Sequence, residues 1–208
     1  FCATQQAVPA FELDRPALVC RWRMAKRQVP MLNRHIRALS QRLVQGRPLT
    51  TNMLSWAKQH VEWSLSEGTY DDPDGVLMLV IDVNGNAAMT VGGYEPLANV
   101  SRTALADRAA EAADEQTQTG VAPEVLCRVE GGVLYVGAAE GEHVCGAMTL
   151  VEQLCETRGH DVVRAGSFAD AVDAAGGVVL LVSDEHGVVC EDAAAAHAGA
   201  GDVGLAQF

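Results

Sequence analysis

A β-hairpin is the strongest local signal in this chain. Two apolar segments, 76–82 and 87–91, flank the tetrapeptide Val-Asn-Gly-Asn at 83–86. An Asn-Gly pair between two such segments is typical of a tight hairpin turn. Because apolar residues at helical spacing occur on both sides of this hairpin, the chain is predicted to have an α+β fold in which hairpins and helices are mixed.

Before the hairpin, the pattern predicts one strand and two helices. Residues 17–24 alternate loosely between apolar and polar and are predicted to form a strand. A second helix is predicted over 50–68, with Thr50 or Thr51 as its N-cap and Gly68 at its end. Apolar residues at helical spacing predict a first helix that extends to the Gly-Arg-Pro segment 46–48, namely Leu32, Ile36, Leu39 and Leu43.

After the hairpin, helices and strands continue to alternate. The Ala-rich segment that follows Ser101 is typical of a helix with a serine N-cap. The most apolar segment of the chain, 177–183, has the length of a buried strand. The predicted elements are, in order, helix 101–115, hairpin 125–136, helix 147–158, strand 161–164, helix 168–175, strand 178–182 and strand 188–190.

Charge is distributed unevenly along the chain. Residues 1–65 contain ten Lys and Arg against three acids, whereas 66–208 contain five Arg against twenty-four acids, and the formal net charge is −12. Parts of opposite charge attract each other, within one chain or across a dimer. We therefore expect a basic N-terminal lobe at 1–96, an acidic C-terminal lobe at 97–192 and an Ala- and Gly-rich tail at 193–208.

Composition also limits the partners and the compartment. The acidic excess argues against nucleic acid and anionic membranes as partners. No apolar segment approaches the roughly 18 residues of a membrane-spanning helix. Residues 1–30 carry seven charged side chains, all from Glu12 onward, and do not resemble a signal peptide. The six cysteines are scattered and form no C-x-x-C pair. Buried, reduced thiols and a cytoplasmic location are therefore expected.

Five fragments, taken in order, carry a family resemblance. They are an H-x-x-R-L-like stretch at 32–39, a paired strand at 77–86, a strand pair at 125–135, a Gly-Ile-Thr-like helix start at 146–149 and a closing turn and strand at 187–190. In order and spacing the chain resembles the class IV (fold-type IV) pyridoxal-phosphate (PLP)-dependent aminotransferases, which include aminodeoxychorismate lyase. The resemblance implies a small N-terminal α/β lobe, a larger lobe of mixed sheet and helices, and a dimer with its cleft near the interface.

The resemblance does not extend to the lysine of the family. A PLP enzyme uses a lysine amine to hold the cofactor as a Schiff base and to move the proton. This chain has only two lysines, Lys26 and Lys58. The resemblance implies a lysine near the start of 97–107, and that segment contains none.

Two further cofactor contacts of the family are also missing. The glutamate that faces the pyridine nitrogen would fall near Gly120. The arginine that binds the phosphate corresponds to Ala38, and Arg37 lies one position earlier. One residue along a helix rotates a side chain by about 100°. The sequence therefore predicts a protein of this fold that has lost its PLP contacts.

The resulting hypothesis is a non-catalytic binding or regulatory homologue, or an enzyme of unrecognised chemistry, that forms a homodimer and holds no cofactor. No catalytic residue and no metal site are assigned, because His143, Cys145 and Cys155 indicate no fourth ligand. The side chains Trp56 and Trp63 suit a core or a dimer interface. A small anionic ligand is expected in a pocket formed by His35, Arg37, Gly146, Ala147, Met148, Thr149 and Ser183.

Two alternatives stay open at this point. One is a working PLP-dependent aminotransferase or aminodeoxychorismate lyase that uses Lys58 or Lys26. The other is an acidic protein-interaction module without a small-molecule site. The turn Asp184-Glu185-His186 follows a buried strand, and it is either a solvated turn or part of a site at the strand end.

Overall fold

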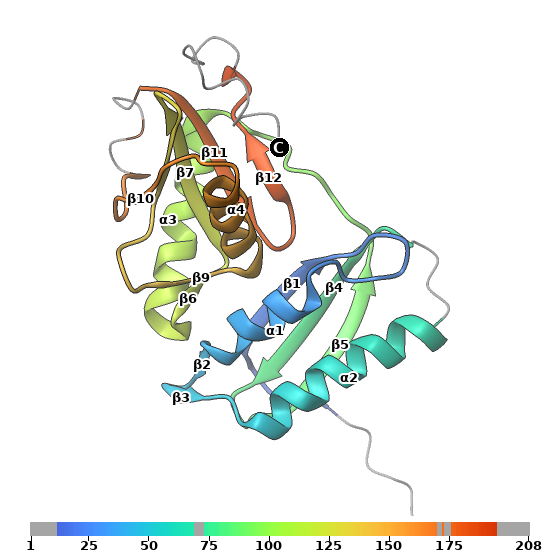
Figure 1. Cartoon of the computed structure of the whole chain (residues 1–208). Helices are drawn as coiled ribbons and strands as arrows, with labels where there is room; N and C mark the ends of the chain where they lie inside the picture. The colour runs from blue at the N-terminus through green and yellow to red at the C-terminus, as the bar shows by residue number, and fades with distance from the viewer. Residues whose placement is uncertain (1–11, 69–72, 170–171, 173–175, 195–208) are drawn as a thin grey trace, which may run out of the picture.

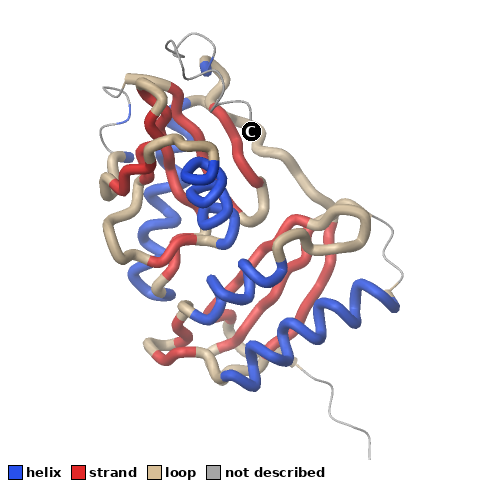
Figure 2. Tube along the Cα trace, in the orientation of Figure 1, coloured by secondary structure: helices blue, strands red, loops and turns tan. Residues whose placement is uncertain are grey.

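The chain folds into two lobes with a layered arrangement of sheets and helices (Figure 1), and the computed structural model confirms the predicted α+β class. Helices and strands alternate along both lobes (Figure 2). The structure describes residues 12–68, 73–169, 172 and 176–194. The predicted helix 168–175 and the predicted tail 193–208 lie mostly outside these residues.

The N-terminal lobe is a three-stranded antiparallel sheet with two helices. The sheet has the order β1-β4-β5, from β1 (Pro16–Arg23), β4 (Val76–Asp82) and β5 (Ala87–Gly92). The helices α1 (Leu32–Ser40) and α2 (Thr51–Glu67) lie over the same face of this sheet (Figure 1). Their apolar faces bury one continuous core, which includes Leu18, Trp22, Leu39, Ala57, Val61, Leu65, Leu77, Leu79 and Ile81.

The first helix is shorter than its apolar spacing predicts. It ends at Ser40, and Leu43 belongs instead to β2 (Leu43–Val44), which pairs with β3 (Arg47–Pro48). Gln45 and Gly46 between these strands both have positive φ, 51° and 73°. Two successive residues with positive φ form a turn whose twist matches that of a β-hairpin. The segment that follows α1 is therefore a hairpin and not a further helical turn.

Two other helix boundaries follow from their caps. The Thr50 hydroxyl accepts a hydrogen bond from the Met53 N–H at 3.2 Å and begins α2, as predicted. Ser101 caps α3 (Arg102–Thr119) in the same way. This helix is longer than predicted, and it ends where Gly120 adopts the left-handed conformation with φ 83°.

The C-terminal lobe has a five-stranded mixed sheet of order β10-β8-β7-β11-β12. Only the β10–β8 pair is parallel. The strands are β7 (Glu124–Glu130), β8 (Val133–Val136), β10 (Val162–Arg164), β11 (Val178–Ser183) and β12 (Gly187–Cys190). A separate two-stranded sheet pairs β6 (Val121–Ala122) with β9 (His143–Val144).

Helices cover both faces of this larger sheet. Helix α4 (Gly146–Thr157) packs on one face, and α3 packs on the other. Because strand side chains alternate between faces and both faces are covered, β11 is apolar from Val178 to Val182, and the middle of β7 is apolar at 125–127. On the α4 side lie Val125, Cys127, Met148, Leu180 and Val182, and on the α3 side lie Leu105, Leu126, Val179 and Leu181.

The two lobes are joined by the segment 93–101 and touch directly. Arg34 on α1 donates a hydrogen bond to the Thr149 hydroxyl on α4 at 3.0 Å and also bonds Gln153. The backbone N–H of Arg23 donates to the carbonyl of Asp184 at 2.9 Å.

No helix in the described part of the chain is both long enough and apolar enough to cross a membrane. The side chains of Cys20, Cys127, Cys145 and Cys155 are buried, as expected, and Cys190 is half-buried.

Candidate functional site

A cavity of about 210 Å³ lies at the junction of the two lobes. The N-terminal lobe contributes β1 and α1 to its wall, and the C-terminal lobe contributes α3, the start of β7 and the end of β11. The lining residues are Val19, Cys20, Arg21, Trp22, His35, Ala38, Leu39, Arg42, Arg108, Glu111, Ala112, Glu115, Pro123, Glu124, Ser183, Asp184 and Glu185.

His35 lies deep in this wall and is only 2% exposed. Its ring stacks on Trp22 with a centroid distance of 5.5 Å and an interplanar angle of 15°. Its Nδ1 lies 3.2 Å from Oδ2 of Asp184, but the two atoms lack the alignment of a hydrogen bond. A Cβ at Gly146 would lie 2.7 Å from the same Nδ1, so only glycine permits this close approach of α4.

The N-terminus of α4 faces a carboxylate of the protein itself. Asp184 Oδ1 accepts a hydrogen bond from the Ala147 N–H at 2.7 Å. Unsatisfied N–H groups and the helix dipole make such a terminus attractive to anions. Here Asp184 takes the position that an anionic group would otherwise occupy.

The seven residues predicted to form an anion pocket do not share one wall. His35 and Ser183 line the cavity, whereas Gly146 and Ala147 lie at the helix start beside Asp184. Arg37 is exposed and lies outside the cavity lining.

The remaining predicted residues have structural contacts. Met148 is buried in the core beside the Cys127 thiol, with 3.5 Å between the two sulfur atoms. The Thr149 hydroxyl donates to the Gly146 carbonyl and accepts from Arg34. Arg34, which the sequence analysis did not select, is thus the α1 arginine that contacts α4.

The cavity is lined by three guanidinium groups and five carboxylates. Arg42 pairs with Glu115 at 2.9 Å, and Arg108 pairs with Glu124 at 2.7 Å. Arg21 reaches Glu185 only at 3.9 Å. Of these residues, the sequence pointed only to Glu185, as part of the turn 184–186, and the others were not predicted. Their one signal is the spacing of 108, 111 and 115, which places three charges on one face of a helix.

The pKa values of two lining groups are shifted. Burial raises the pKa of the Cys20 thiol to about 11, so this thiol is protonated at neutral pH and is a weak nucleophile. Burial acts to lower the pKa of Arg42, but its neighbours Cys20, Glu115 and Asp184 raise it above its ordinary value. The guanidinium therefore stays charged although its side chain is almost fully buried.

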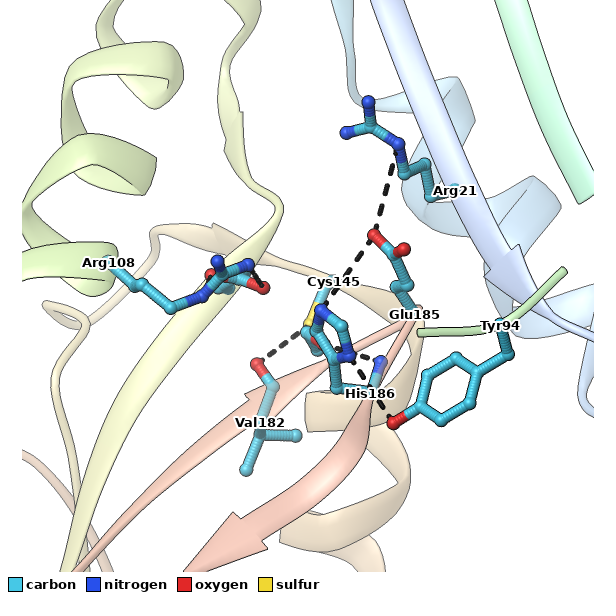
Figure 3. A network of polar contacts seen from close by, with 9 residues as sticks. Arg21, Tyr94, Arg108, Cys145, Val182, Glu185 and His186 are labelled. Atoms are coloured by element: carbon cyan, nitrogen blue, oxygen red, sulfur yellow. Dashed lines mark hydrogen bonds and ion pairs between the residues drawn. The ribbon is translucent and has the colours of Figure 1, made fainter. Parts of the chain in front are cut away.

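A second polar network lies beside the cavity, around the turn after β11 (Figure 3). Glu185 lies between Arg21 and His186, and the His186 Nε2 is 3.9 Å from its carboxylate. The Nδ1 of His186 lies 3.4 Å from the Tyr94 hydroxyl, and Arg23 stacks 3.3 Å above the Tyr94 ring centroid. Burial lowers the pKa of His186, so its neutral form dominates at pH 7. The turn therefore belongs to the lobe junction.

Both lysines of the chain lie away from the cavity. Lys26 is exposed in the turn after β1, and Lys58 lies on α2. Neither lines the cavity wall. Within the described residues, no group of three His, Cys, Asp or Glu side chains is arranged to hold a metal ion.

Comparison with solved structures relates this arrangement to one class of fold. A fold IV-transaminase from Curtobacterium pusillum is 12% identical with a TM-score of 0.53, and the match covers 85% of this chain and 78% of that one. A hypothetical aminotransferase from Mycobacterium tuberculosis, bound to alpha-ketoglutarate and PMP, is 12% identical with a TM-score of 0.53 and coverages of 89% and 86%. A putative 4-amino-4-deoxychorismate lyase from Legionella pneumophila is 11% identical with a TM-score of 0.50 and coverages of 89% and 87%.

The chain therefore has the fold of the class IV aminotransferases and aminodeoxychorismate lyase, as the sequence resemblance implied. No protein-family model matches the sequence. The search of curated proteins likewise found no match. At this level of identity the likeness concerns the fold alone.

Proposed function

We propose that this protein is a ligand-binding, non-catalytic homologue with the fold of the class IV aminotransferases, and that the cavity between its lobes is the ligand site. The position of the two lysines carries the proposal. Schiff-base chemistry needs an amine at the cavity, and both Lys26 and Lys58 lie outside the cavity wall.

The rest of the wall also fits PLP poorly. A phosphate would have to approach the N-terminus of α4, where the Asp184 carboxylate already accepts the Ala147 N–H. Carboxylates outnumber guanidinium groups in the lining, which disfavours a dianionic group. With about 210 Å³, the cavity is also smaller than the roughly 300–1,000 Å³ of drug-sized sites. These features support a function without this cofactor.

Borohydride trapping tests the proposal against the working-enzyme alternative. The folded protein is incubated with PLP, reduced and analysed by peptide mass spectrometry. We expect no more adduct on Lys26 or Lys58 in the folded protein than in urea-unfolded protein, where any exposed amine reacts. An adduct that requires the folded state and disappears in Lys26→Arg or Lys58→Arg would refute the proposal and favour a PLP-dependent enzyme.

We further propose that the protein is a cytoplasmic homodimer. The support is the aromatic group on α2, where the half-buried Trp56 stacks on His60 with a centroid distance of 4.9 Å and Trp63 is 56% exposed. Large exposed aromatic residues are typical of interfaces. Light scattering should give a dimer mass, and Trp63→Ala should shift the protein toward the monomer. A monomer at all concentrations would contradict this part of the proposal.

A further inference from the structure

Five carboxylates line the cavity, but only two of them form a close ion pair with an arginine of the wall. Glu115 and Glu124 are held close to Arg42 and Arg108, at 2.9 and 2.7 Å. Glu111, which is exposed at the cavity rim, makes no ion pair within the described residues. Two other carboxylates, Asp184 and Glu185, lack a close guanidinium partner, since Arg21 approaches Glu185 only at 3.9 Å.

The two carboxylate oxygens of Asp184 differ in their hydrogen bonding. Its Oδ1 accepts the Ala147 N–H, whereas the one described polar atom found beside its Oδ2 is the Nδ1 of His35, at 3.2 Å. That Nδ1 is fully buried and has no hydrogen-bond partner among the described residues. His35 is thus a buried polar side chain of the cavity wall whose contact with Asp184 is incomplete. A donor placed in the cavity can complete the hydrogen bonding of the Oδ2 atom.

We propose that the cavity binds a small organic cation with an amidinium, guanidinium or ammonium group, held by Asp184, Glu185 and Glu111. The inference rests on the proposed function, because it names the ligand class of the same cavity. The buried side chains of Trp22 and Leu39 give the wall an apolar part that suits the hydrocarbon portion of such a ligand.

The carboxylates of the cavity raise the pKa values of two arginines that also line it, Arg108 and Arg42. A hydrogen bond to Glu124 raises the pKa of Arg108, and Glu185 and Glu111 raise it further, against the opposing effect of burial. Asp184 also contributes to the raised pKa of Arg42. A positive ligand in the same space is stabilised for the same reason.

Of the seven residues expected to hold an anionic ligand, only His35 and Ser183 line the cavity. Arg37 is exposed outside the cavity, and the α4 terminus is occupied by Asp184. An anionic ligand therefore stays a prediction from the sequence. A comparison of cationic, neutral and anionic probes can test it.

Three probes of equal size and different charge test the inference. Pentanamidinium, pentanamide and pentanoate have the same number of heavy atoms and carry charges of +1, 0 and −1. In calorimetric titrations of the whole protein, we expect pentanamidinium to bind at least about tenfold more tightly than pentanamide, because charge-assisted hydrogen bonds are the stronger ones. Pentanoate should give no measurable binding.

Charge-removing variants locate the site. Glu185→Gln and Glu111→Gln should each weaken pentanamidinium binding by about three- to tenfold. Glu67→Gln is the matched control, because it removes the same charge from an exposed position on α2, away from the cavity. Thermal unfolding of each variant tests whether the fold is retained.

Three results would overturn the inference. They are tighter binding of pentanoate than of pentanamidinium, no binding of any probe up to millimolar concentrations, and equal weakening by Glu67→Gln and the cavity variants. A folded-state PLP adduct instead refutes the proposed function itself, so the two failures are distinguishable.

Discussion

The two sheets of this molecule are protected to different degrees. The sheet of the C-terminal lobe has α3 on one face and α4 on the other, and its strand β11 is buried along its whole length. The sheet of the N-terminal lobe has both helices on one face, and its edge strand β5 is at most half-buried. The C-terminal lobe therefore holds a fully enclosed apolar layer, which the N-terminal lobe lacks.

The difference shows how the cavity is supported. The carboxylates of the cavity lie on or next to the enclosed lobe, at α3 and at the ends of β7 and β11. The N-terminal lobe presents His35 and Arg42 across the junction from a less protected scaffold. We therefore expect substitutions in the C-terminal lobe to cost more stability than matched substitutions in the N-terminal lobe.

The largest effect is expected at a buried ion pair of the C-terminal lobe. Glu191 has a fully buried carboxylate that accepts two hydrogen bonds from Arg102, at 2.7 and 2.9 Å, and one from the Val179 N–H. Glu191→Gln removes the buried negative charge that faces the Arg102 guanidinium and should cost about 3–5 kcal/mol of unfolding free energy. Arg21→Gln, at the exposed 3.9 Å pair, should cost less than about 1 kcal/mol. Urea unfolding measures both, and equal losses would contradict the comparison.

A cavity-creating substitution tests the apolar layers directly. Leu181 on β11 is fully buried against the α3 side, and Leu181→Ala should cost about 2–5 kcal/mol. Met89 on β5 is only partly buried, and Met89→Ala should cost about 1 kcal/mol or less. The shift of the urea midpoint reports the difference. A larger loss for Met89→Ala would mean that β5 is covered in the folded protein, for example by a partner subunit.

The contact between the lobes depends on a glycine. In Gly146→Ala, the new Cβ meets His35 Nδ1 at 2.7 Å and its backbone N at 3.0 Å, so α1 and α4 must separate, at a cost of about 1–3 kcal/mol. Gly92→Ala is the control in the N-terminal lobe, since nothing lies within 4 Å of the added atom. Thermal unfolding should separate the two variants. Identical midpoints would contradict the close approach of α1 and α4.

The smallest effect is a pH dependence from the N-terminal lobe. Burial acts to raise the pKa of Asp82, but hydrogen bonds from the Asn86 side chain and from the backbone of Asp14, Asn86 and Asn84 lower it below its ordinary value. A lowered folded-state pKa stabilises the fold above the unfolded value of about 4, and this stabilisation is lost as the pH falls through the lower folded value. Below pH 4, the free energy of unfolding should therefore fall less steeply with decreasing pH in Asp82→Asn than in the unmodified protein.

The matched control for this titration is Glu67→Gln, which removes an exposed carboxylate of the same lobe. It should leave the slope of the acid transition unchanged. An equal change in both variants would remove Asp82 as the cause.

The local signals of the sequence predicted most helices and strands correctly, because periodicity and caps act within a few residues. The Asn-Gly hairpin and the Thr50 cap are examples. Leu43 shows where helical periodicity fails as a signal. Its spacing fits a helix, but it lies in a short hairpin, β2–β3, with a two-residue turn. Arg37 shows another, because helical spacing cannot tell which side of α1 faces α4, and Arg34 makes that contact.

The sequence by itself determined the α+β class, the absence of a lysine from 97–107, and the opposite net charges of residues 1–65 and 66–208. Only the tertiary structure decided that Asp184 caps α4, that His35 lies against it, and that carboxylates line the junction. The physical reason is distance along the chain. Helix and turn preferences are properties of neighbouring residues, whereas a cavity forms where segments more than a hundred residues apart pack together.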